Sequence, residues 1–229
     1  MRALLALAAV IGLVAIGCDG VTGGDDSSPG LYPVIGDTAE LVIASVSVPG
    51  FTESESEYVD NRAAALTTVD TDKWLADYER LGRVNGFSRT FKSRELFGSE
   101  IDSTASVYRD VAGARVAWDN AARFVRRQSR SVSEEGGVNV LEASELPGYS
   151  LAHNTLRFRI KVTYENLGSL LSLETVILSF RVANVVGAVT WATFNDSIPT
   201  SDVEEIALTQ IDKIIQAIEH PALPAETGA

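Results

Sequence analysis

The clearest pattern along the chain is a strict alternation of apolar and polar residues in "TLRFRIKVTY", residues 155–164. A period of two predicts a β-strand with one face buried and the other face in water. The apolar face would consist of Leu156, Phe158, Ile160, Val162 and Tyr164, and the polar face of Thr155, Arg157, Arg159, Lys161 and Thr163.

Two further strands are expected at 174–182 and 185–194. Ala183 and Asn184 between them suit a tight turn, because Asn tolerates a positive φ. This turn fixes the pairing, which places Val182 opposite Val185, Phe180 opposite Gly187, Leu178 opposite Val189 and Val176 opposite Trp191. The large side chains then share one face, so the hairpin predicts a single core that includes Phe180, Leu178, Val189 and Trp191.

Helical spacing appears in three places. Residues 54–81 predict one helix or two, with a stripe of Trp74, Leu75, Tyr78 and Leu81, acids at 53–60 near its start, and Gly82 at its end. Asp110 is the expected N-cap of a second helix, whose apolar face is Ala114, Ala117, Trp118, Ala121 and Phe124, and a polar loop is expected at 128–137. A last helix begins with a capping box of Ser201 and Glu204 and carries the stripe Val203, Ile206, Ala207, Ile211, Ile214 and Ile218, before Pro221 and Pro224.

The remaining strands are expected at 41–48, before a turn at Pro49-Gly50, and at 85–92 and 100–108. Short turns between consecutive strands predict an antiparallel sheet. We therefore expect the fold class α+β, with an antiparallel β-sheet flanked by helices.

The first residues suit export. Met1 and Arg2 precede an apolar run from Ala3 to Gly17, which as a helix would reach about 22 Å, short of a ~30 Å hydrocarbon core. This is the pattern of a secretory signal peptide. Residues 15–18, "AIGC", resemble the processing box of bacterial lipoproteins, although Ala15 stands where that family most often has Leu.

The lipoprotein resemblance implies cleavage before Cys18 and a lipid, such as diacylglycerol and palmitate, on this cysteine. The partner would then be the membrane, and Asp19 resembles a signal for retention on the outer side of the cytoplasmic membrane rather than in an outer membrane. An uncleaved apolar anchor, or an ordinary signal peptide with an incidental cysteine, are the alternatives. Cys18 is the single cysteine, so no internal disulfide is expected.

The expected organisation is therefore a signal peptide at 1–17, a Gly- and Ser-rich tether at 18–38, one α+β domain at 39–221 and a frayed tail at 222–229. Two stretches, "STASVYRDVAGARVAWDNA" and "FRVANVVGAVTWATF" with "SDVEEIALTQIDKII", resemble small bacterial lipoproteins of unknown function whose domain is PsbP-like. That resemblance implies an α-β-α sandwich on an antiparallel sheet, and it implies no activity.

The charge and the motifs narrow the function. A net charge of −12 disfavours nucleic acid as a partner. The sequence has no phosphate loop, serine elbow or dinucleotide fingerprint. Neither His153 nor His220 has another histidine or a cysteine nearby in sequence, so a zinc site built locally is not expected. Asp70, Thr71 and Asp72 are interpreted as a helix start rather than a calcium loop, since Trp74 occupies its fifth position. No enzyme activity and no cofactor are therefore expected.

One group of charges stands out on this acidic background. Arg157, Arg159, Lys161 and Arg181 are expected on one wet face of the sheet, where they would bind an anionic ligand or an acidic protein partner. The other interpretation is a solvated face balanced by local acids. We expect a membrane-anchored, extracytoplasmic, non-catalytic binding or accessory module. The alternative is a carrier of a hydrophobic ligand in a groove between sheet and helices, and an enzyme is the third possibility.

Overall fold

The computed structural model describes residues 37–66, 70–94, 98–131, 138–152, 154–166, 169–194 and 196–219. The signal peptide, Cys18, both histidines and the tail after 219 lie outside these ranges. The elements in chain order are η1 (Thr38–Leu41), β1 (Phe51–Val59), α2 (Asn61–Leu66), α3 (Thr71–Arg80), β2 (Arg83–Ser93), β3 (Glu100–Tyr108), α4 (Val111–Ser131), β4 (Val138–Glu145), β5 (Asn154–Asn166), β6 (Ser169–Val182), β7 (Val185–Phe194) and α5 (Thr200–Glu219).

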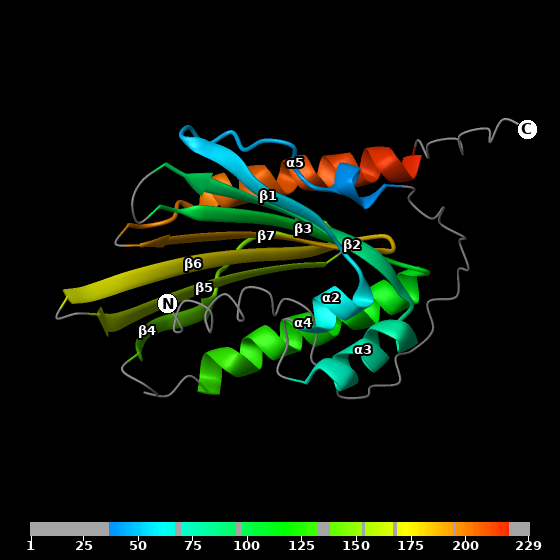
Figure 1. Ribbon diagram of the computed structural model, residues 1–229, viewed down its shortest axis with the longest axis horizontal. Coiled ribbons are helices and arrows are strands. Elements are labelled where there is room, and N and C mark those ends of the chain that lie inside the picture. The colour runs from blue at the N-terminus through cyan, green and yellow to red at the C-terminus, as the bar shows by residue number, and fades with distance from the viewer. Residues whose placement is uncertain are drawn as a thin grey trace, which may run out of the picture.

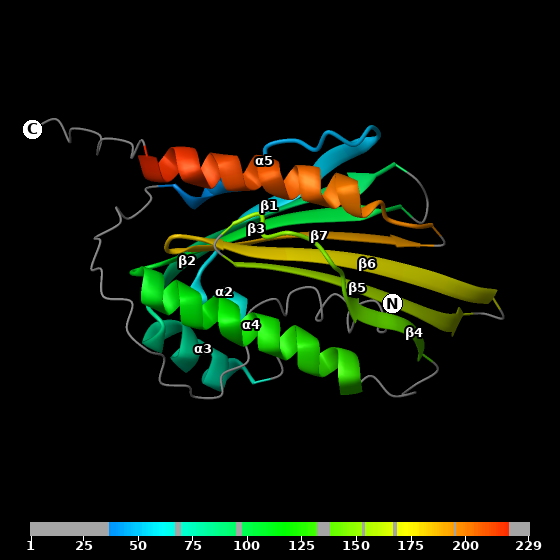
Figure 2. The same ribbon diagram turned by 180° about the vertical axis from the view of Figure 1, so that it is seen from behind.

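A single seven-stranded sheet is the main body of the described chain. Its order is β1-β2-β3-β7-β6-β5-β4, and every neighbouring pair is antiparallel. Helix α5 runs along one face, and α4 runs along the other, next to α2 and α3 (Figures 1 and 2). No helix in the described ranges is long and apolar enough to cross a membrane.

The expected fold class, an α+β sandwich of the PsbP-like kind, is wrong. The fold is mostly sheet, and strands hold more of the described residues than helices do. Helix was overpredicted, because most of β1 falls within the predicted helix 54–81. The sheet was underpredicted, because β5 and β6 are longer than expected. As Figure 1 shows, both strands extend past the ends of the helices. The antiparallel pairing itself was predicted correctly.

The N-terminal part of the domain differs most from expectation. Residues 41–48 form no strand: Leu41, Val42 and Ile43 are all buried in succession, which a half-buried strand does not allow. The strand lies after the turn instead, where β1 alternates Ser and Glu on an exposed sheet edge. Charged side chains suit such an edge, because they discourage pairing with another chain. Thr38, assigned to the tether, is fully buried in η1.

The β6–β7 hairpin has the predicted register. Val182 faces Val185, and Phe180 faces Gly187. The positive φ of the turn is at Ala183, with φ 48°, and not at Asn184 as expected. Asn184 instead donates from Nδ2 to the carbonyl oxygen of Tyr108, at 2.7 Å, and so ties the turn to β3.

The core between the sheet and α5 confirms the predicted set. Phe180, Leu178, Val189 and Trp191 belong to one buried cluster with the apolar stripe of α5. Gln210 is the polar member of that helix face and is fully buried. Its Oε1 accepts from Ser103 Oγ at 3.0 Å, and its Nε2 donates to the carbonyl oxygen of Thr104 at 2.8 Å. Both ends of the amide are therefore satisfied, as burial requires.

The helix starts were predicted with mixed success. Asp70 accepts from Lys73 N at 3.2 Å and Asp110 accepts from Gly113 N at 2.6 Å, so both cap helices as expected. The capping box of α5 is wrong. Ser201 lies inside the helix and its Oγ donates to Asp202 Oδ1, at 3.1 Å, while Glu204 binds an arginine of β5. Helix α4 also continues to Ser131, into the predicted loop.

Candidate functional site

The predicted basic face of β5 is covered rather than open. In the β5–β6 register Arg157 faces Leu178 and Arg159 faces Val176, so both arginines lie on the side that packs against α5. Arg157 is only 4% exposed. Its Nε donates to Glu204 Oε1 at 2.6 Å. The expectation of a wet face is therefore wrong for Arg157.

Arg181 is not part of this group. It pairs with Asn154 at the other end of β5, and its parity on β6 places it on the α4 side of the sheet. It is buried, and it donates from Nε to Asn154 Oδ1 at 2.8 Å and from Nη1 to the carbonyl oxygen of Ala183 at 3.1 Å. The prediction assumed that the apolar faces of β5 and β6 coincide. They do not, because the apolar side chains of β5 pack on the α4 side of the sheet, whereas most of those of β6 pack on the α5 side.

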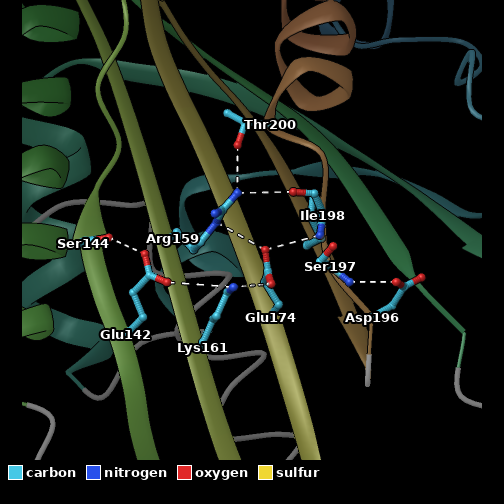
Figure 3. A network of polar contacts seen from close by, with 9 residues as sticks. All are labelled: Glu142, Ser144, Arg159, Lys161, Glu174, Asp196, Ser197, Ile198 and Thr200. Carbon is cyan, nitrogen blue, oxygen red and sulfur yellow. Dashed lines mark hydrogen bonds and ion pairs between the residues drawn. The ribbon is translucent and has the colours of Figure 1, made fainter.

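Glu174 is the centre of the charges that remain on the α5 side (Figure 3). This carboxylate is 4% exposed and lies 3.2 Å from Arg159 Nε and 3.1 Å from Lys161 Nζ. It also accepts from the backbone N of Ile198, at 3.3 Å. A buried carboxylate with two cations and a backbone donor is compensated in the way that burial of a charge demands.

This network holds the start of α5 against the sheet. Arg159 Nη2 donates to Thr200 Oγ1 at 2.8 Å and to the carbonyl oxygen of Ile198 at 3.3 Å. Glu142 on β4 lies 3.9 Å from Lys161, at the more exposed edge (Figure 3). The basic residues of β5 are thus balanced by local acids, as one of the two interpretations predicted, but the face is covered rather than solvated. Their charges have a structural use.

A different part of the same sheet face is hollowed. A cleft of about 590 Å³ lies between η1 and the residues after it, β2 and α5. It is lined by Ala39, Glu40, Ala44, Arg89, Lys213, Gln216 and Ala217. These residues come from three segments that are far apart in sequence, and η1 contacts both β2 and α5. Figure 1 shows η1 close to α5.

Arg89 is held in place at this cleft. Its Nη1 donates to the carbonyl oxygen of Ile43 at 2.9 Å, and its Nε lies 3.5 Å from Glu53 Oε2. The guanidinium also stands over the ring of Phe87, 5.4 Å from the centroid. Among the described residues, neither Nη2 of Arg89 nor the ammonium of the half-buried Lys213 has a hydrogen-bond or ion-pair partner.

One half-buried acid was missed by the sequence analysis. Asp102 on β3 accepts from Thr90 Oγ1 at 2.6 Å. Desolvation, with a smaller contribution from Glu100, raises the pKa of the Asp102 carboxyl to about 6, against the lowering effect of the Thr90 hydrogen bond. Its position in the alternating pattern of β3 gave no sign of this, because serine and threonine are its neighbours on that face.

The described residues contain no cluster of three or more His, Cys, Asp or Glu side chains that could hold a metal ion. Asp70 and Asp72 belong to the start of α3, as expected. Cys18, His153 and His220 lie outside the described residues.

No protein-family model and no curated protein matches this chain. Among solved structures, the chain is similar to the extracellular domain of PknH from Mycobacterium tuberculosis, with a TM-score of 0.50 and 11% sequence identity. The match covers 82% of this chain and 100% of that one. At this identity the likeness concerns the fold alone.

Proposed function

We propose that this protein is a non-catalytic binding module, held on the outer side of a bacterial cytoplasmic membrane by lipid on Cys18. The observation that carries the binding function is the cleft between η1, β2 and α5. Two cationic side chains and one amide, those of Arg89, Lys213 and Gln216, line it together with small alanines. Small side chains leave room for a ligand, and fixed polar groups orient it.

The location is supported by two independent features. The apolar run that ends at Cys18 resembles a lipoprotein signal. The fold is similar to a domain that is extracellular in PknH. A glycine- and serine-rich stretch between Cys18 and Asp37 would let the domain stand away from the membrane.

The packing favours a binding module over a carrier of a hydrophobic ligand. A carrier would need apolar space between the sheet and a helix. In the described residues, the interface with α5 is filled by Phe180, Leu178, Trp191 and the helix stripe. The cleft lies at the edge of this interface and is lined by charged residues as well as alanines.

Two mass-spectrometry measurements on the full chain extracted from membranes test this proposal. Intact mass spectrometry should find acyl chains on Cys18. Cys18→Ser should release the protein from the membrane fraction, because serine has no sulfur to carry the lipid that would anchor it. Native mass spectrometry should then find a bound small molecule in the parent protein.

The matched variants localise that molecule. Ala44→Trp fills the cleft and should abolish the bound mass, whereas Ala112→Trp on the exposed start of α4 should retain it. An unmodified Cys18 would contradict the anchoring. A bound mass that survives in Ala44→Trp, or no bound mass in the parent protein, would contradict the binding function of the cleft.

A further inference from the structure

We infer that the cleft between η1, β2 and α5 binds the oxyanion of a small ligand, a carboxylate or a phosphate, between Arg89 and Lys213. This inference rests on the proposed function and names the ligand class of its site. The expected anion site was the group of basic residues on β5. The site inferred here consists instead of two cationic residues that the sequence pattern did not single out. The residues that line the cleft and the contacts of their side chains support this inference in three steps.

The first step is the pairing of the cations. Elsewhere on this face, Arg157, Arg159 and Lys161 each lie within 4 Å of a carboxylate. In the cleft, Lys213 has no such partner among the described residues. Arg89 donates from Nη1 to a backbone carbonyl and has only a 3.5 Å ion-pair contact with Glu53 at Nε, and its Nη2 has no partner among the described residues. An arginine and a lysine that both line one cleft are suited to the oxygens of a carboxylate or phosphate.

The second step is the rigidity of Arg89. The backbone of Ile43 and the ring of Phe87 fix its guanidinium, and its side chain is only 16% exposed. A charge that is already held in place loses little conformational entropy when a ligand binds. Its Nε is buried without a hydrogen-bond partner, and the Glu53 carboxylate 3.5 Å away balances part of the charge. Lys213 adds a second positive charge to the lining of the cleft.

The third step is the acid at the rim. Glu40 also lines the cleft and is exposed, so it opposes an anion there. This gives the proposal a signed test. Removal of Lys213's charge should weaken the binding of an anion, and removal of Glu40's charge should strengthen it. If Lys213 and Glu40 had only structural roles, the two substitutions would not change anion binding in these opposite directions.

The probes are citrate and inorganic phosphate, titrated separately by calorimetry into the full chain in detergent. We expect Lys213→Gln to raise the Kd of the bound probe about three- to tenfold and Glu40→Gln to lower it about threefold, as single charges near a protein surface do. Lys92→Gln is the charge-matched control, because Lys92 lies outside the cleft and pairs with Glu100 at 3.2 Å. It should leave the Kd unchanged.

The two probes separate the two ligand sources. Tighter binding of citrate indicates a carboxylate ligand, and tighter binding of phosphate indicates a phosphorylated one. Added salt should weaken either, since exposed charges are screened beyond about 10 Å at 0.1 M. No binding of either probe at about 10 mM, or equal Kd values in Lys213→Gln and Glu40→Gln, would overturn the oxyanion site. A neutral ligand retained in native mass spectrometry would still leave the proposed binding function intact.

Discussion

The ring of Phe180 occupies the space where a side chain of Gly187 would lie. A Cβ built on Gly187 would be 2.5 Å from Cε2 of Phe180, and Phe180 itself is fully buried against α5. The two residues face each other in the β6–β7 register. A large residue and an empty position therefore form one packing unit at the centre of the core.

This unit predicts two opposite kinds of damage. Phe180→Ala should lower the free energy of unfolding by about 3–5 kcal/mol, because it leaves a cavity. Gly187→Ala should lower it by about 1–3 kcal/mol, because it overpacks the same place. Urea denaturation checks both. This packing would be contradicted if the free energy of unfolding of Phe180→Ala lay within about 1 kcal/mol of that of the parent protein, or if Gly187→Ala were more stable than the parent protein.

The charge network around Glu174 should be needed for stability. Glu174→Gln leaves Arg159 and Lys161 without their closest carboxylate and should lower the free energy of unfolding by about 3 kcal/mol. The control is Glu142→Gln, whose carboxylate is 36% exposed and 3.9 Å from Lys161, and which should cost at most about 1 kcal/mol. Equal losses in the two variants would show that burial of Glu174 does not matter.

The start of α5 separates two accounts of Glu204. If Glu204 served a capping box, Ser201→Ala would cost about 1 kcal/mol. The structure instead predicts almost no effect of Ser201→Ala and a clear loss in Glu204→Gln, because Arg157 is buried and loses its ion pair. Chemical denaturation of the two variants decides, and a larger loss in Ser201→Ala would restore the capping box.

Asp102 predicts a pH dependence of defined sign. Its pKa is raised to about 6, so above pH 6 the folded protein holds a partly desolvated charge that destabilises it. Asp102→Asn should therefore be more stable than the parent by about 2 kcal/mol at pH 7.5, and the difference should shrink as the pH falls through 6 toward 4. Thermal melts across this range provide the measurement.

The control for this prediction is Asp212→Asn on the exposed side of α5, which should show no such trend between pH 4 and 7.5. An advantage of Asp102→Asn that stays constant with pH, or that grows toward acid pH, would contradict the raised pKa.

Much of the sheet could be predicted because its signals are local. The turn at Ala183 and Asn184 fixes the register of a hairpin, and the stripe of α5 requires a partner such as the Phe180 face. β1 could not be predicted, because "TESESE" has a period of two but contains no apolar residue to identify a strand. The alternation of β5 identified a strand but not what covers its polar side.

The candidate site was beyond sequence reasoning for a related reason. The alternating pattern of β5 predicts that Arg157 is exposed. Its guanidinium can be buried because it forms an ion pair with Glu204, which is 47 positions away in sequence. Likewise, Arg89 and Lys213 are ordinary charges of a strand and a helix until the fold brings both to one cleft. Long-range placement of charges carries no local period.

The most direct test of the binding cleft is an NMR titration of the full chain with citrate, observing the side-chain Nε–Hε signals of its arginines. The Arg89 signal should shift in a saturable way, while that of Arg80, which pairs with Asp77 on exposed α3, should stay unchanged. Shifts that spread equally over the arginines, or that involve Arg80 and leave Arg89 still, would contradict an oxyanion site in this cleft.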